Sequence, residues 1–144
     1  MIFIILITLI ILPFGSFANN SLASVNFSKP DNVVSNAIQY LMNKNFSNLL
    51  ELTEFSEKRR VEKIIEAYLT EKNLIDTEIL NIQSYKILNT YYEGEFAVVS
   101  VEWVVKNKYQ TREGPKTYNA NRRVLYLLKK FDDKWKIITK RVET

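Results

Sequence analysis

A strictly alternating stretch, residues 96–106, is the feature that most constrains how this chain can fold. Its side chains repeat with the two-residue period of a β-strand. One set is entirely apolar and is predicted to face the core: Ala97, Val99, Val101, Trp103 and Val105. The other set is mixed, with Glu102 in its middle. Glu93 and Gly94 just before the strand predict a tight hairpin turn, because glycine readily adopts the positive φ that such turns need.

Helical patterns precede this strand. A first helix is predicted to begin near Pro30, which suits a first turn, with Ser28 or Asp31 as its cap. A short helix follows with Ser47 as its cap, and a longer helix runs from residue 56 to about residue 71. The charged side of the longer helix is predicted to face solvent. It consists of Glu57, Lys58, Arg59, Glu62, Lys63 and Glu66.

Three further strands are predicted around the central one. Residues 79–92 form the first, where a change of alternation indicates a β-bulge near Gln83 and Ser84. The rest of the chain divides into a polar loop and two strands, over residues 107–117, 118–131 and 135–142. The sequence therefore predicts an α+β fold, in which N-terminal helices pack on one face of a curved, four-stranded antiparallel sheet.

The first residues of the chain have the pattern of an export signal. Residues 1–12 are apolar and uncharged, and Pro13 and Gly15 end this run. Small side chains at Ser16 and Ala18 fit a signal-peptidase site. Because the run is shorter than the about 20 residues of a membrane-spanning helix, we expect no stable membrane span.

These patterns divide the chain into three parts. We predict a signal peptide, a flexible lead and one folded domain, over residues 1–18, 19–29 and 30–144. The protein is then periplasmic or secreted. An uncleaved N-terminal membrane anchor is the alternative, because no Lys or Arg precedes the apolar run.

The 144-residue sequence contains no cysteine and no histidine. This excludes disulfides, thiolate catalysis and cysteine-ligated zinc, and it removes the commonest general base and the commonest metal ligand. We therefore predict no metal and no cofactor. Any acid–base chemistry would depend on carboxylates, tyrosines and lysines with shifted pKa values.

Two short motifs carry a family resemblance. Residues 44–50 place a polar turn, an aromatic residue and paired leucines after the first helix, and residues 133–137 read Asp-Lys-Trp-Lys-Ile in the last hairpin. With these, residues 30–142 resemble the nuclear transport factor 2-like (NTF2-like) superfamily, most of all its small exported bacterial members of unknown function, although Asp133 stands where Gly is typical. The resemblance implies a cone-shaped α+β domain. The superfamily includes isomerases and dehydratases that place an Asp–His pair, or an Asp with a Tyr, in the cone. Because this chain has no histidine, the Asp–His pair cannot be carried over to it.

Glu102 is the candidate catalytic residue, because it is a carboxylate within an otherwise apolar strand. Facing the cone, it would have a raised pKa suited to a general base, with Tyr126 donating a hydrogen bond to a ligand carbonyl. The alternative places Glu102 on the open face of the sheet, paired with Arg122 or Arg123. The candidate ligand-binding residues are Tyr68, Glu102, Trp103 and Tyr126.

The sheet also suggests partners. Lysines and an arginine on the last hairpin are predicted to be a solvated edge that guards against strand addition, not a nucleic-acid site: Lys129, Lys130, Lys134, Lys136, Lys140 and Arg141. Apolar residues on both faces of the sheet predict a homodimer around a two-fold axis. We expect a non-catalytic exported binding or assembly domain, whose partner is a second copy, a small apolar ligand or an envelope protein. The alternatives are a Glu102-dependent isomerase or lyase and a periplasmic subunit of a secretion or envelope assembly.

Overall fold

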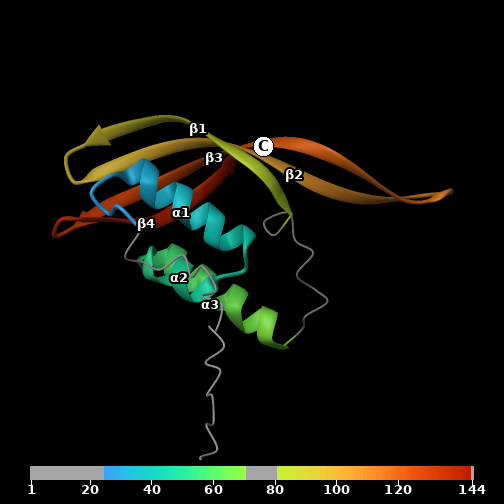
Figure 1. Cartoon of the computed structure of the whole chain (residues 1–144), viewed down its shortest axis with the longest axis horizontal. Coiled ribbons are helices and arrows are strands. Elements are labelled where there is room, and N and C mark those ends of the chain that lie inside the picture. The colour runs from blue at the N-terminus through green and yellow to red at the C-terminus, as the bar shows by residue number, and fades with distance from the viewer. Residues whose placement is uncertain (1–24, 71–80, 144) are drawn as a thin grey trace, which may run out of the picture.

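The structure, a computed structural model, describes residues 25–70 and 81–143, so the predicted signal peptide lies outside the described residues. Three helices are followed by four strands, and the sheet has the antiparallel order β1-β2-β3-β4. The elements are α1 (Pro30–Met42), α2 (Phe46–Glu51), α3 (Phe55–Thr70), β1 (Ile82–Glu93), β2 (Phe96–Thr111), β3 (Gly114–Phe131) and β4 (Lys134–Glu143). The helices all lie on one side of the bent sheet (Figure 1). The predicted α+β fold is confirmed.

The residues that cap the first two helices differ from the predicted ones. Pro30 opens α1, but its N-cap is Lys29, which makes no capping side-chain bond. At α2, Asn45 is the cap, and its side chain accepts a hydrogen bond from the Asn48 backbone N–H. Ser47 lies inside that helix, so its predicted role as cap is wrong. Asn45 occupies the boundary because its own N–H still closes the end of α1 on the Tyr40 carbonyl, at 2.8 Å.

The sheet has an inner face, toward the helices, and an outer face. The five apolar residues of the central alternation are all buried on the inner face, as predicted. Antiparallel pairing of β2 with β3 places Leu128, Tyr126 and Val124 beside them on the same face. In β1 the register shifts between Ile82 and Ser84, which confirms the predicted bulge, and it shifts again between Ile87 and Asn89.

The predicted polar loop over residues 107–117 is wrong. The two strands continue past the sheet as a paired ribbon, from Lys106 opposite Asn119 to Thr111 opposite Gly114. We call residues 106–119 the arm, and Figure 1 shows it extending beyond the end of the sheet. Its turn is closed by the Thr111 hydroxyl, which donates to the Gly114 carbonyl at 2.6 Å. Because neither face of the arm is covered by a helix, its strands show no apolar alternation. The sequence pattern therefore predicts a loop at these residues.

The segment before α1 is part of the packed domain. Val25 is buried, and the Phe27 carbonyl accepts a 2.9 Å hydrogen bond from the Trp135 backbone N–H at the start of β4. Trp135 is itself buried and packs edge-to-face against Tyr92, with ring centroids 6.0 Å apart. The domain core therefore begins at least five residues ahead of the first helix, within the predicted lead.

Candidate functional site

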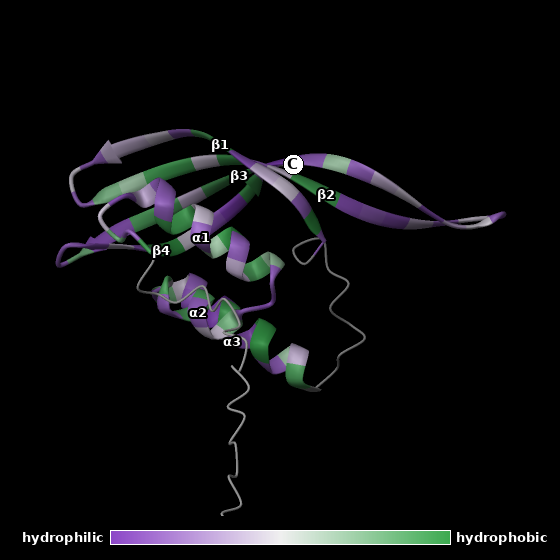
Figure 2. Cartoon of the chain, in the orientation of Figure 1, coloured by the Kyte–Doolittle hydropathy of each residue, from purple (hydrophilic) through white to green (hydrophobic). Residues whose placement is uncertain are grey.

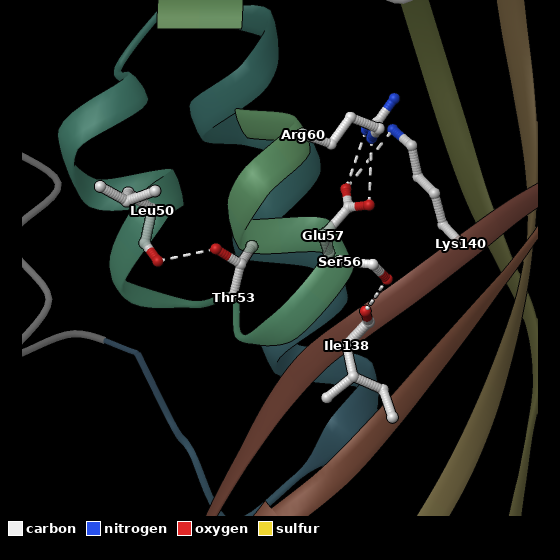
Figure 3. A network of polar contacts seen from close by, with 7 residues as sticks. All are labelled: Leu50, Thr53, Ser56, Glu57, Arg60, Ile138 and Lys140. Atoms are coloured by element: carbon white, nitrogen blue, oxygen red, sulfur yellow. Dashed lines mark hydrogen bonds and ion pairs between the residues drawn. The ribbon is translucent and has the colours of Figure 1, made fainter. Parts of the chain in front are cut away.

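A cluster of charged and aromatic side chains is buried between α3 and the inner face. The segment that leads into α3 is fixed onto β4 by backbone bonds from Glu54 N to Ile137 O and from Ile137 N to Leu52 O, each 2.9 Å. The Ser56 hydroxyl donates to the Ile138 carbonyl at 2.8 Å (Figure 3). This anchoring turns the next residue, Glu57, toward the sheet.

Glu57 forms ion pairs with two cations that come from different elements. Its carboxylate accepts from Arg60 Nη2 at 2.8 Å and from Arg60 Nε at 3.1 Å, one turn along α3. Lys140 Nζ on β4 lies 4.0 Å from the same carboxylate (Figure 3). The Glu57 and Lys140 side chains are 6% and 4% exposed, whereas Arg60 keeps 33% of its side chain in solvent. The cluster thus has one carboxylate for two cations.

Aromatic rings complete the surroundings of Lys140. Its ammonium lies 4.8 Å from the ring centroid of Trp103 and 5.8 Å from that of Tyr126. These distances fit cation–π contacts, which are stronger when they are desolvated. Lys140 therefore has both an ionic and an aromatic partner inside the domain.

A β-bulge is the reason that Lys140 points inward. Pairing of β3 with β4 shifts at Ile138, so that Ile137 lies opposite Leu128 while Lys140 lies opposite Tyr126. Without the extra residue, strict alternation from the buried Ile137 would direct Lys140 to the outer face. The prediction of Lys140 as part of a solvated, edge-guarding group is therefore wrong.

Burial shifts two pKa values in this cluster. The pKa of Lys140 falls to about 7, first because burial disfavours the ammonium and then because Arg60 repels it, while Glu57 acts in the opposite direction. Burial also raises the pKa of Tyr126 well above its usual value, and Glu57 adds to that rise. Near neutral pH, Lys140 exchanges between a charged and a neutral amine.

The space beside this cluster is nearly full. The cavity lined by Glu57, Arg60, Tyr126 and Lys140, together with apolar neighbours, measures about 10 Å³. That volume holds about one water molecule. The Trp103 indole partly offsets the rise in the pKa of Tyr126, yet its Nε1 has no partner with full hydrogen-bond geometry in the described residues. The space between α3 and the sheet at this cluster is therefore filled almost entirely by side chains.

The outer face carries a much larger concavity, at the β1–β2 turn. It measures about 460 Å³. We call it the groove. It is lined by Tyr91, Tyr92, Glu93, Phe96, Ala97, Val98 and Leu127. Figure 2 shows hydrophobic residues along the part of the sheet that includes this end, and mainly hydrophilic ones on the arm.

The structure separates the four predicted ligand-binding residues. Trp103 and Tyr126 meet on the inner face, with ring centroids 6.3 Å apart. Tyr68 lies on α3 against Phe46, at 5.3 Å. Glu102 alternates with the buried residues of β2 and therefore lies on the outer face, in register with Lys86 on β1 and Arg123 on β3. A ligand between the helices and the sheet would meet Trp103 and Tyr126 but not Glu102.

With this geometry established, comparisons with known proteins bear on the fold. The sequence matches no family model, and no curated protein matches it significantly. Several solved structures share the architecture. One is an NTF2-like protein of unknown function from Shewanella oneidensis MR-1, with a TM-score of 0.52 and 15% identity over 78% of this chain and 93% of that one. The chain has the NTF2-like fold.

Two more solved structures resemble this chain. The intermembrane space region of the chloroplast protein ARC6 has a TM-score of 0.50 and 14% identity over 81% of this chain and 95% of that one. A SEC-C motif containing protein from Rhodopseudomonas palustris has a TM-score of 0.51 and 12% identity over 83% and 82%. Identities this low establish a shared fold alone.

Two absences apply to the described parts of the chain. Over residues 25–70 and 81–143, no helix has the length and hydrophobicity to cross a membrane. Over the same ranges, no group of three acidic side chains is placed to hold a metal ion.

The burial of Glu57 differs from what the sequence predicts. The prediction of a solvated helix face that includes Glu57 is wrong at this position, where the residue is 5% exposed. A signal was present, because Glu57 stands four residues before Val61 and seven before Ile64, in line with the apolar stripe of α3. Arg60, three residues on, is the partner that makes its burial possible.

Proposed function

We propose that this NTF2-like domain is an exported, non-catalytic assembly domain that associates with a second copy of itself through the outer face of its sheet. The observation that carries the proposal is the contrast between its two faces. The inner cavity measures about 10 Å³, and the outer groove about 460 Å³. Pockets for small molecules usually measure about 300–1,000 Å³, so of these two spaces among the described residues the outer groove is the one with room for an occupant.

The outer face exposes apolar side chains that soluble monomers usually cover. Tyr91 and Phe96 are 65% and 43% exposed, on neighbouring strands. Val98, Leu125 and Leu127 lie half-buried on the same face and extend this surface across β2 and β3. Burying them against another copy would gain about 25 cal/mol for each Å² of apolar surface removed from water.

Export supports an assembly role more than a catalytic one. The apolar run and the small residues before Asn19 favour delivery outside the cytoplasm. The chain has no histidine for general acid–base catalysis, and its buried Lys140 and Tyr126 border a space too small for a substrate. An interaction through the outer face requires neither a histidine nor an open space beside Lys140 and Tyr126.

Analytical ultracentrifugation of the chain as its host produces it, over a micromolar concentration series, tests the proposal. We expect a mass above that of the monomer. Val98→Lys should reduce it to the monomer without changing the circular dichroism, because the lysine would place a charge in the apolar groove. Ser47→Lys adds the same charge at an exposed position on α2 and should change nothing. A wild-type chain that stays monomeric at every concentration contradicts the proposal.

A further inference from the structure

The arm has the features of a contact element. A two-stranded ribbon is only marginally stable on its own in water. Among the described residues, no strand pairs with the outer edge of β2 from Asn107 onward, and none pairs with β3 ahead of Arg123. Most side chains of residues 106–119 are exposed. The arm therefore offers two faces and two edges to a partner.

One face of the arm is aromatic and flanked by cations. Tyr109 and Tyr118 lie on the side that continues the inner face, with ring centroids 5.5 Å apart, and they are 46% and 49% exposed. Lys116 lies directly opposite Tyr109 in the ribbon, and Arg112 is in the turn at the tip. The arm as a whole has four cationic side chains and one carboxylate. An apolar cleft with acidic residues at its edge would suit such a surface.

The groove of the same protein meets that description. It lies at the β1–β2 turn, which is at the opposite end of the sheet from the arm (Figure 1). Its lining is mainly aromatic and aliphatic, with Glu93 as the charged residue among the lining side chains. Glu95, in the same turn, is a second exposed carboxylate. One cation also lies nearby, because Lys129 Nζ is 5.9 Å from the Phe96 ring centroid. The groove therefore complements the arm in polarity and, at its turn, in charge.

We infer that the arm of one copy occupies the groove of the next. Tyr109 and Tyr118 are removed from water when they pack among the aromatic side chains of the groove. Lys116 or Arg112 then forms an ion pair with Glu93. This inference rests on the proposed function and names the surface of the second copy that fills the outer face. Arm and groove are different surfaces at opposite ends of the sheet. A contact made in one direction is therefore heterologous and builds a ring or an open chain, whereas two copies that exchange arms form a closed two-fold pair.

Mixing two blocked variants tests the inference. The groove variant Val98→Lys keeps its arm, and the arm variant Tyr109→Ser with Tyr118→Ser keeps its groove. We expect each variant alone to associate at least about 10-fold more weakly than the wild type, a loss of about 1.4 kcal/mol. An equimolar mixture should form a one-to-one heterodimer and nothing larger. In that complex the one intact arm occupies the one intact groove, and no intact arm or groove remains to bind a third copy.

Matched controls make each outcome decisive. Gln110→Ser with Thr117→Ser changes two exposed residues on the other side of the arm and should leave association unchanged. Hydrogen exchange of arm amides verifies that the arm variant keeps its ribbon, and Lys116→Glu provides a second arm variant that retains both tyrosines. An arm variant that associates like the wild type, or a mixture that forms no heterodimer, overturns the inference and leaves the proposed function intact. A wild type that never associates overturns the proposed function itself.

Discussion

Lys140 Nζ lies 4.0 Å from the carboxylate of Glu57 in the layer between α3 and the sheet, and both side chains are almost fully removed from solvent. Replacing such pairs by apolar residues often costs a protein nothing, whereas removing one partner is strongly destabilising. The stability of the domain should therefore depend on pH, and it should fall when either Glu57 or Lys140 is replaced alone. Two predictions follow from this arrangement.

The first prediction concerns pH. The pKa of Lys140 is about 7 in the folded protein, against an ordinary 10.5. Between these values the unfolded chain binds more protons than the folded one, so the free energy of unfolding should rise with pH, by up to about 1.4 kcal/mol per pH unit. Below pH 7 this contribution is constant. Above pH 10 the raised pKa of Tyr126 acts in the opposite direction, because only the unfolded chain then releases that proton.

Urea unfolding at intervals from pH 6 to pH 9.5 measures this slope. Lys140→Met keeps the length of the side chain and removes its titration, so the rise should flatten in the variant. The charged groups around Lys140 are Glu57 and Arg60 from α3, and the neutral phenol of Tyr126 from β3 is the other titratable group. An equal slope in the wild type and the variant would show that Lys140 titrates as an exposed lysine does.

The second prediction concerns Glu57→Gln. This change removes the carboxylate that both Arg60 and Lys140 contact and leaves two cations together. We expect a loss of about 3 kcal/mol in the free energy of unfolding at pH 6, and a smaller loss at pH 9, where Lys140 is neutral. Glu62→Gln on the exposed side of α3 is the control and should cost less than about 0.5 kcal/mol. A loss that is independent of pH would mean that Lys140 does not depend on this carboxylate.

Local patterns predict the sheet well, because its central strand has one face fully buried. That burial fixes the parity of residues 97–105, and with it the side on which the helices pack. The strands of the arm are not predicted from the sequence, because a ribbon with no buried face shows no two-residue alternation of apolar side chains. Among the elements that the structure describes, this segment extends farthest from the helices (Figure 1).

The buried cluster was missed because it depends on tertiary structure. The spacing of Glu57 in the apolar stripe of α3 and its pairing with Arg60 are local, but the second cation of the cluster, Lys140, comes from a strand more than 80 residues away. Lys140 in turn faces inward only because of the register shift at Ile138. Neither the pairing of Glu57 with Lys140 nor the bulge has a local sequence signal of the kind that predicted the bulge in β1.

A third prediction is that Trp135 is structural. It is 4% exposed, it packs on Tyr92, and its backbone N–H holds Phe27 against the start of β4. Trp135→Ala should therefore cost about 3–5 kcal/mol in the free energy of unfolding, measured by urea denaturation. Tyr118→Ala removes an aromatic side chain that is half exposed on the arm and should cost less than about 1 kcal/mol. A loss below about 1 kcal/mol for Trp135→Ala would identify it as a surface residue.

The last prediction concerns the N-terminus, on which the exported role depends. Ser16 and Ala18 are small residues at the −3 and −1 positions of a signal-peptidase site, so we expect cleavage after Ala18 and a mature chain that begins at Asn19. Intact-mass measurement of exported protein checks this directly. Ala18→Phe should block cleavage by placing a large side chain at the −1 position, and Asn20→Phe, just past the site, should leave it unchanged. A mature, membrane-bound protein that keeps residues 1–18 would instead establish the uncleaved anchor, because an apolar run that stays attached holds the domain at the membrane.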